Sequence, residues 1–331
     1  MTEPVLFAPL ASRPFGERVA AALGVGLAPM EEREYEGGEH KARPLVGVRG
    51  RDVFVVQCLS GDAAASANDR LCRLLFFIAC LADNGAASVT ACVPFLAYAR
   101  KDRRTKERDP VNLRYAAQLF EAVGTSRVLA LDVHNLAAFE NAFRCPVDPL
   151  EAAPLFADWL AREARDEPVC IVSPDIGGAK RAQRLKDLLV ARTGRDVAFA
   201  VIDKRRSGGV VSGGDLVVGP VAGCRAVIVD DLIGAGTTLM RAVQACRGAG
   251  AAWVDALATH GVFTPESRQL LGPGGPDRLV VTDSILPTRL EPGPGETPPV
   301  VLPVSTLFAE AIRRLSTGGS VVELRELEPR R

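Results

Sequence analysis

The chain has 331 residues, enough for roughly two domains, and 47% of them are hydrophobic, so sizeable cores are expected. Its 40 Lys and Arg residues balance its 40 Asp and Glu residues, so neither a nucleic acid nor a membrane surface is an expected partner. The longest apolar run, residues 74–82, is too short to span a bilayer, and no signal peptide is recognisable. Eight cysteines without a C-x-x-C pair are typical of reduced thiols, which favours a cytoplasmic protein.

Apolar strand-like segments alternate with helical ones along the chain, which predicts an α/β fold with mostly parallel sheets flanked by helices. The segment that starts at Gly85 recurs at Gly250, an offset of 165 residues, so two similar units related by internal duplication are expected. The predicted division is residues 1–150, residues 151–304, and a C-terminal helix and tail over residues 305–331. Ser305 is a candidate N-cap of that helix, and Phe76 and Phe77 are expected in the core.

Two features of the first half suggest an anion site. Residues 98–108 carry six basic side chains just after a strand predicted over residues 89–93. A dense cationic loop at a strand end suits a polyphosphate, although a solvated loop is an equally good interpretation. His134 follows a strand predicted over residues 128–132, where it is either a ligand or an ordinary core histidine.

Two segments of the second half combine a strand end, an acid or a cation, and glycines. In residues 173–181, Gly177 and Gly178 can expose N–H groups to a diphosphate, and Asp175 can hold its metal ion. In residues 203–206, three consecutive cations precede a glycine-rich stretch, a pattern that suits a mobile charged lid.

Residues 226–239 are the most informative stretch of the chain. An apolar strand is followed by Asp230 and Asp231, then by a small-residue loop, and then by the start of a helix. N–H groups at a helix N-terminus favour phosphate, and two acids beside them favour sugar hydroxyls and a magnesium ion. This segment therefore predicts a ribose-phosphate site, while a plain strand–turn–helix corner is the simpler alternative.

Taken in order, these segments resemble the ribose-phosphate pyrophosphokinase (PRPP synthetase) family over nearly the whole chain. The matching segments are Tyr98-Ala-Arg-Lys-Asp102, Leu131-Asp-Val-His134, Ser173-Pro-Asp-Ile-Gly-Gly178, Asp203-Lys-Arg-Arg206, Val229-Asp-Asp231, Thr259-His-Gly261 and Ala309-Glu-Ala-Ile-Arg-Arg314. The resemblance implies two phosphoribosyltransferase-type domains, and homodimers that assemble into hexamers. It also implies a Mg²⁺-dependent transfer of the diphosphoryl group of ATP to the 1-hydroxyl of ribose 5-phosphate, giving PRPP and AMP for nucleotide biosynthesis.

The resemblance also implies roles for individual residues. ATP would be bound by Tyr35, Glu39, Arg100, Lys101 and His134, with Tyr35 and Glu39 reaching into a neighbouring subunit's site. His134 and Asp175 would hold the metal ion, and Lys204 and Arg206 would stabilise charge during transfer. Ribose 5-phosphate would be bound by Asp230, Asp231, Gly234, Ala235, Gly236, Thr237 and Thr238, and the diphosphate by Asp175, Gly177 and Gly178.

The chain departs from the family pattern at several of these places. The family usually has an Asn or Asp where Gly37 stands, Gln in place of Lys101, and side chains with acid or hydroxyl groups in place of Gly234 and Ala235. The segment after Arg206 is richer in glycine than in the family. Two alternatives therefore stay open: a non-catalytic regulatory homologue that binds nucleotide, and a phosphoribosyltransferase that consumes PRPP.

Overall fold

The computed structural model describes residues 4–164, 166–203, 216–285 and 290–325. The chain divides into two compact units, and each is described by itself. The first unit comprises the residues up to Glu151 together with the segment that starts at Val304, and the second comprises Ala152–Pro303. None of the described helices is both long and apolar enough to cross a membrane.

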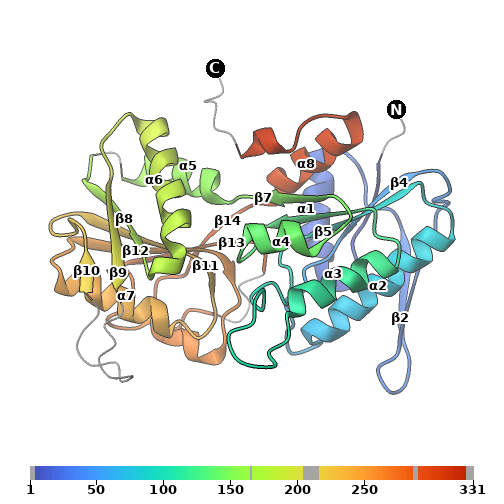
Figure 1. The fold of residues 1–331 in the computed structure, drawn as a ribbon, viewed down its shortest axis with the longest axis horizontal. Helices are drawn as coiled ribbons and strands as arrows, with labels where there is room; N and C mark the ends of the chain where they lie inside the picture. The colour runs from blue at the N-terminus through green and yellow to red at the C-terminus, as the bar shows by residue number, and fades with distance from the viewer. Residues whose placement is uncertain (1–3, 165, 204–215, 286–289, 326–331) are drawn as a thin grey trace. The chain divides into compact units, whose positions relative to one another are not determined.

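The first unit is built on a five-stranded parallel sheet with the order β1-β4-β5-β6-β7 (Figure 1). Its elements are β1 (Val5–Phe7), α1 (Arg13–Leu23), β2 (Met30–Glu34), β3 (His40–Pro44), β4 (Asp52–Val56), α2 (Ala67–Asp83), β5 (Ser88–Val93), α3 (Asn112–Ala122), β6 (Arg127–Leu131), α4 (Leu136–Ala142), β7 (Val147–Leu150) and α8 (Ser305–Thr317). Strands β2 and β3 form a separate antiparallel hairpin.

Both faces of this first sheet are apolar, because its parallel strands lie between helices. Alternate residues such as Val53 and Val55 pack with α2, α3 and α4 in one core cluster. Helices α1 and α8 pack against each other, with the rings of Phe15 and Phe308 edge to face at 5.6 Å. The C-terminal helix thus completes the first unit.

The second unit contains a seven-stranded sheet with the order β10-β9-β8-β11-β12-β13-β14, in which only β10 runs antiparallel to its neighbour among the described strands. Its elements are α5 (Ala153–Glu163), β8 (Val169–Ser173), η2 (Ile176–Gly178), α6 (Ala179–Thr193), β9 (Ala198–Asp203), β10 (Leu216–Val218), β11 (Arg225–Ile233), α7 (Thr237–Gly248), β12 (Trp253–Gly261), η3 (Pro265–Leu271), β13 (Arg278–Thr282) and β14 (Val300–Leu302). Helices α5 and α6 pack together, and α7 lies on the opposite side of the sheet (Figure 1).

The two sheets repeat one pattern of strand pairing. The order β1-β4-β5-β6-β7 corresponds to β8-β11-β12-β13-β14, with β9 and β10 added at one edge of the second sheet. The register agrees as well, since Thr90 pairs with Arg127 in the first sheet and Asp255 pairs with Arg278 in the second. Thr90 and Asp255 are separated by the same 165 residues as the Gly85 and Gly250 segments. The predicted fold class, two α/β domains with parallel sheets flanked by helices, is confirmed.

Three local expectations were wrong. Ser305 is the first residue of α8 rather than its N-cap, which is Val304. Strand β11 does not end at the acid pair but continues to Ile233, because β12 extends alongside it to Gly261. Phe77 is fully buried as expected, but the Phe76 side chain is 64% exposed, because neighbouring residues on a helix face different directions.

Candidate active site

The acid pair Asp230 and Asp231 lies in β11, beyond the point where its pairing with β8 stops at Ile228. Asp231 is 5% exposed, and the Asp230 carboxylate accepts a 2.8 Å hydrogen bond from the Asp231 N–H. The Asp231 carboxylate in turn accepts a 3.0 Å bond from the N–H of Leu232. Two acids are thus fixed at the carboxyl edge of a parallel sheet, where α/β proteins bind their ligands.

Burial and the charge of Asp231 raise the pKa of Asp230 to about 7. Arg181 opposes this rise, because its guanidinium nitrogens lie 3.7 Å from an oxygen of Asp230 and 3.7 Å from an oxygen of Asp231. These separations are longer than hydrogen bonds, so Arg181 compensates the two charges only in part. The pair is therefore ready to accept hydrogen bonds from a ligand's hydroxyl groups or to face a cation.

The loop after the acids carries the predicted phosphate seat. Gly234 and Ala235 are followed by Gly236, which has a φ of 79° and caps the N-terminus of α7. A Cβ atom on Gly236 would lie 2.9 Å from the side chain of Leu270, so glycine is required there for conformation and for space. Thr237 and Thr238 are exposed in the first turn of α7. The loop thus presents a helix N-terminus next to the acid pair.

The predicted diphosphate loop follows the neighbouring strand β8. Asp175 caps the short η2 helix, and its carboxylate accepts a 3.0 Å hydrogen bond from the N–H of Gly178. A Cβ atom on Gly178 would lie 2.9 Å from the hydroxyl of Ser173, whereas Gly177 is exposed. Arg181 stands in the first turn of α6, which follows directly. This loop and the acid pair are therefore connected through Arg181.

The basic loop after β5 is organised around one acid. The Asp109 carboxylate contacts the Lys101 ammonium at 2.5 Å and accepts hydrogen bonds from the N–H groups of Thr105 at 3.0 Å and Lys106 at 2.9 Å. Hydrogen bonds from Lys101 and Thr105 hold the pKa of Asp109 well below its usual range. Lys101 is thus tied into the loop, while Arg100 is exposed.

His134 lies between β6 and α4, at the edge of the sheet next to that loop. The adjacent residue Asn135 caps α4 and donates a 2.7 Å hydrogen bond to the carboxylate of Asp102. Since Asp102 follows Lys101 directly, this contact brings the segments of Arg100, Lys101 and His134 together. These three predicted ATP contacts therefore share one edge of the first sheet.

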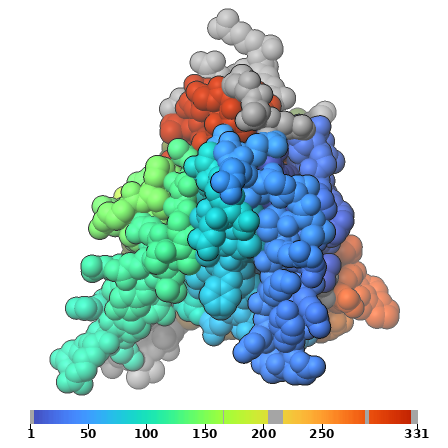
Figure 2. Space-filling model, turned by 90° about the vertical axis from the view of Figure 1, so that its right-hand side faces the viewer, coloured from blue at the N-terminus to red at the C-terminus, as the bar shows by residue number. Residues whose placement is uncertain are grey.

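Tyr35 and Glu39 are placed elsewhere in the first unit, in the turn of the β2–β3 hairpin (Figure 2, blue). The N–H of Tyr35 donates to the carbonyl of Glu39 at 2.8 Å, and Gly37 and Gly38 both have a positive φ. Tyr35 is 38% exposed, and the guanidinium carbon of Arg33 lies 4.9 Å from the centre of its ring. The structure thus presents both residues at the surface on a separate hairpin.

Some predicted residues stay untested. Lys204 and Arg206 lie outside the described residues, directly after β9. His134 belongs to the first unit and Asp175 to the second, and the described residues contain no group of three or more His, Cys, Asp or Glu side chains that could hold a metal ion.

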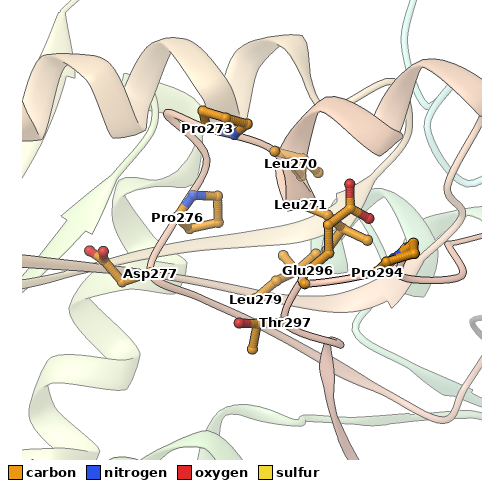
Figure 3. Close-up of a pocket in the computed structure, with 11 residues that line it drawn as sticks. Leu270, Leu271, Pro273, Pro276, Asp277, Leu279, Pro294, Glu296 and Thr297 are labelled. Atoms are coloured by element: carbon orange, nitrogen blue, oxygen red, sulfur yellow. The ribbon is translucent and has the colours of Figure 1, made fainter.

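A cavity of about 330 Å³ lies in the second unit (Figure 3). Leucine and proline are the most frequent residues in its lining, and its two acids are already engaged. Asp277 contacts Arg247 at 3.2 Å and the N–H of Val254 at 2.7 Å, and Glu296 contacts Arg268 at 3.0 Å. None of the predicted site residues lines this cavity, so we do not assign the reaction to it.

Arg181 is the site residue that the sequence reasoning missed. Its signal was present, because Lys180 and Arg181 follow Gly178 at the start of a helix, where cations are unfavourable. A cation at that place needs acidic partners, and the acids of β11 supply them.

The comparisons with known proteins agree over nearly the whole chain. Family models match for the N-terminal domain of ribose phosphate pyrophosphokinase over residues 4–124, the phosphoribosyl transferase domain over residues 151–268, and the phosphoribosyl synthetase-associated domain over residues 214–325. A ribose-phosphate pyrophosphokinase from Hyphomonas neptunium is 35% identical over 95% of this chain and 97% of its own length. One from Granulibacter bethesdensis is 36% identical over the same shares.

A solved structure agrees with these matches. The crystal structure of phosphoribosylpyrophosphate synthetase from Mycobacterium smegmatis is 31% identical, covers 96% of this chain and 100% of its own, and superposes with a TM-score of 0.85. The chain therefore belongs to the ribose-phosphate pyrophosphokinase family.

Proposed function

We propose that the chain transfers the diphosphoryl group of ATP to the 1-hydroxyl of ribose 5-phosphate and releases AMP. The observation that carries this proposal is the acid pair of β11 followed by a short loop and a helix N-terminus, because the acids suit sugar hydroxyls and the helix N-terminus suits a phosphate. The near full-length relatives named ribose-phosphate pyrophosphokinase support it and do not favour the two alternatives.

In this reaction the 1-hydroxyl oxygen of the sugar forms a bond to the β-phosphorus of ATP. The bond between that phosphorus and the oxygen bridging it to the α-phosphorus breaks, AMP leaves, and the hydroxyl proton passes to solvent. The attacked phosphorus is surrounded by anionic oxygens of the triphosphate, so catalysis depends mainly on positioning and on neutralising charge. We assign the positioning of the sugar to Asp230 and Asp231, and of its 5-phosphate to residues 234–238.

The ATP side of the reaction is assigned to the first unit. Arg100, Lys101 and His134 would contact the phosphates, and Tyr35 and Glu39 would contact the nucleoside from a neighbouring subunit. Asp109 contacts Lys101 and accepts hydrogen bonds from the N–H groups of Thr105 and Lys106, so it would hold the basic loop in one conformation for the ATP phosphates. Lys204 and Arg206, outside the described residues, would add positive charge as the diphosphoryl group moves.

Asp175 offers the kind of oxygen ligand that a magnesium ion prefers. Asp175 supplies a carboxylate, which its hydrogen bond with Gly178 orients, and His134 supplies an imidazole. Mg²⁺ is usually held by one or two protein carboxylates together with substrate phosphates, so a complete cage of protein ligands is not needed. When bound, the ion would neutralise charge on the ATP oxygens.

We further propose that the chain forms homodimers that assemble into hexamers. Exposed apolar side chains on α2 and α3 support contact between copies: Phe76 is 64%, Tyr115 47% and Leu119 50% exposed. Replacing Phe76 by Ser should shift the mass measured by light scattering toward smaller species. A mass equal to that of wild type would exclude Phe76 from the interface.

The activity is tested by following AMP during incubation with ATP and Mg²⁺, with and without ribose 5-phosphate. AMP formation that requires the sugar supports the proposal. An Asp231→Asn variant tests whether the acid pair serves this reaction. It keeps the shape of the side chain but removes one charge next to the sugar, so it should slow the reaction by roughly 10- to 100-fold. Consumption of PRPP with a nucleobase, without AMP formation from ATP, would instead indicate a phosphoribosyltransferase.

A further inference from the structure

The carbonyl groups of Ile233, Gly234 and Ala235, where β11 passes into the phosphate loop, all accept hydrogen bonds from one neighbouring segment, residues 263–269. The carbonyl of Ile233 accepts a 3.0 Å hydrogen bond from the N–H of Phe263, and that of Gly234 accepts a 3.3 Å bond from the N–H of Thr264. The carbonyl of Ala235 accepts a 3.0 Å bond from the side-chain amide of Gln269. Three consecutive peptide units of the loop are therefore anchored on the same side.

This anchoring decides where the N–H groups of the loop point. The chain has no cis peptide bonds among its described residues, and in a trans peptide the N–H points opposite to the carbonyl of the same unit. The N–H groups of Gly234, Ala235 and Gly236 therefore point away from residues 263–269. Within the described part of the chain, none of these three N–H groups donates a hydrogen bond.

The anchoring segment, residues 263–269, and the residues that flank it are tightly constrained. Phe263 is fully buried and has a φ of 42°, and its ring would lie 2.4 Å from a Cβ atom on Gly261. The Ser267 N–H and hydroxyl both donate to the carbonyl of Thr264, at 2.9 Å and 2.7 Å. Leu270 is 1% exposed and contacts the position of Gly236. A strained residue persists only where its surroundings impose it, and such residues concentrate at functional sites.

We propose that Gln269 is a positioning residue, which holds the phosphate loop so that its N–H groups face the 5-phosphate of ribose 5-phosphate. The inference rests on the function proposed above. It accounts for how the loop can bind phosphate although Gly234 and Ala235 carry no polar side chains. In such a loop, affinity depends on the direction of backbone N–H groups, and that direction depends on the carbonyl anchors.

The variant Gln269→Met tests this role, because methionine has a similar length and no charge but cannot donate to the carbonyl of Ala235. Arg268→Met is the matched control. Arg268 is the adjacent residue and is exposed like Gln269, but its guanidinium contacts the carbonyl of Glu291 and the carboxylate of Glu296, both at 3.0 Å, rather than the loop.

For Gln269→Met, the Kd for ribose 5-phosphate measured by calorimetry and its KM should rise on the order of 2- to 10-fold. The KM for ATP and the Tm should stay at wild-type values. Arg268→Met should leave both KM values unchanged. Wild-type affinity for ribose 5-phosphate in Gln269→Met, or an equal rise in the KM for ATP, would overturn the proposal.

A second measurement needs no substrate. Amide hydrogen exchange of peptides from residues 261–270 should be faster in ligand-free Gln269→Met than in wild type or Arg268→Met, because the anchor is weakened. Unchanged exchange would overturn the positioning role even if ribose 5-phosphate bound less tightly, since a direct contact would then explain the loss. If the wild-type protein made no AMP from ATP and ribose 5-phosphate, the proposed function itself would fail, whatever the exchange showed.

Discussion

Asp230 should destabilise the ligand-free protein at neutral and alkaline pH, so its replacement by Asn should stabilise the fold. Burial and the neighbouring Asp231 charge raise the pKa of Asp230 to about 7, from an ordinary value of 3.8. A carboxyl whose pKa is raised in the folded state contributes stability that is fully present below pH 3.8 and is lost as the pH rises through about 7. Asparagine keeps the shape, and its amide oxygen can still accept the bond from the Asp231 N–H.

The size of the effect follows from the shift. A rise from 3.8 to about 7 corresponds to at most roughly 4 kcal/mol at about 1.36 kcal/mol per pH unit. The Asp230 side chain is 31% exposed, and Arg181 lies 3.7 Å away, so solvent and this cation reduce the expected gain to about 2 kcal/mol. For a unit of this size, that gain is a rise in Tm of about 4–8 °C.

Thermal unfolding of Asp230→Asn and wild type, measured from about pH 4 to about pH 8, tests this reasoning. The variant should be more stable at the alkaline end, and the difference should vanish at the acid end. It should also bind ribose 5-phosphate roughly 10- to 100-fold more weakly, because a charged acceptor for the sugar hydroxyls is lost. A variant that is no more stable than wild type at about pH 8, or a difference independent of pH, would refute it.

Three further outcomes follow from the structure. Gly236→Ala forces a side chain onto a φ of 79° and into the neighbouring leucine, so its KM for ribose 5-phosphate should rise at least about 10-fold, whereas Gly248→Ala, at the other end of α7 and with open space around it, should match wild type. Asp255→Ala removes the buried partner of Arg225, which is itself 5% exposed and keeps only the more exposed Glu167 at 3.1 Å, so denaturant unfolding should show a loss of about 3 kcal/mol; a loss below about 1 kcal/mol would contradict this. Asp109→Ala removes the acid that orders the basic loop, so the KM for ATP should rise about 2- to 10-fold while that for ribose 5-phosphate stays constant; equal changes in both would show that the loop does not serve ATP.

The sequence was enough to predict the fold class and the duplication of its units, because both depend on patterns that repeat along the chain. Apolar strands that end in acids or glycines recur in each half, and Thr90 and Asp255 pair with Arg127 and Arg278, respectively, at equivalent places in the two sheets. The candidate sugar site could also be proposed from the sequence, since Asp230 and Asp231 lie next to the small-residue loop along the chain.

Contacts between distant segments could not be predicted in this way. The hydrogen bonds from Phe263 and Gln269 to the carbonyl groups of the phosphate-loop region join positions some thirty residues apart, and no local pattern in residues 261–270 predicts them. The end of β11 was misplaced for a similar reason, because its length is set by its partner β12 rather than by its own residues. The exposure of Phe76 depends on which side of α2 faces the sheet, which an almost continuous apolar run does not reveal.

The central claim is that the chain moves a diphosphoryl group rather than a single phosphoryl group. Phosphorus NMR of the wild-type protein with ATP, ribose 5-phosphate and Mg²⁺ tests it most directly, because it shows where each phosphorus of ATP ends. We expect the β- and γ-phosphorus signals to reappear together in PRPP while AMP accumulates in equal amount. Formation of ADP, together with a ribose 5-phosphate that carries one phosphate on its 1-hydroxyl in place of the diphosphate, would contradict the claim.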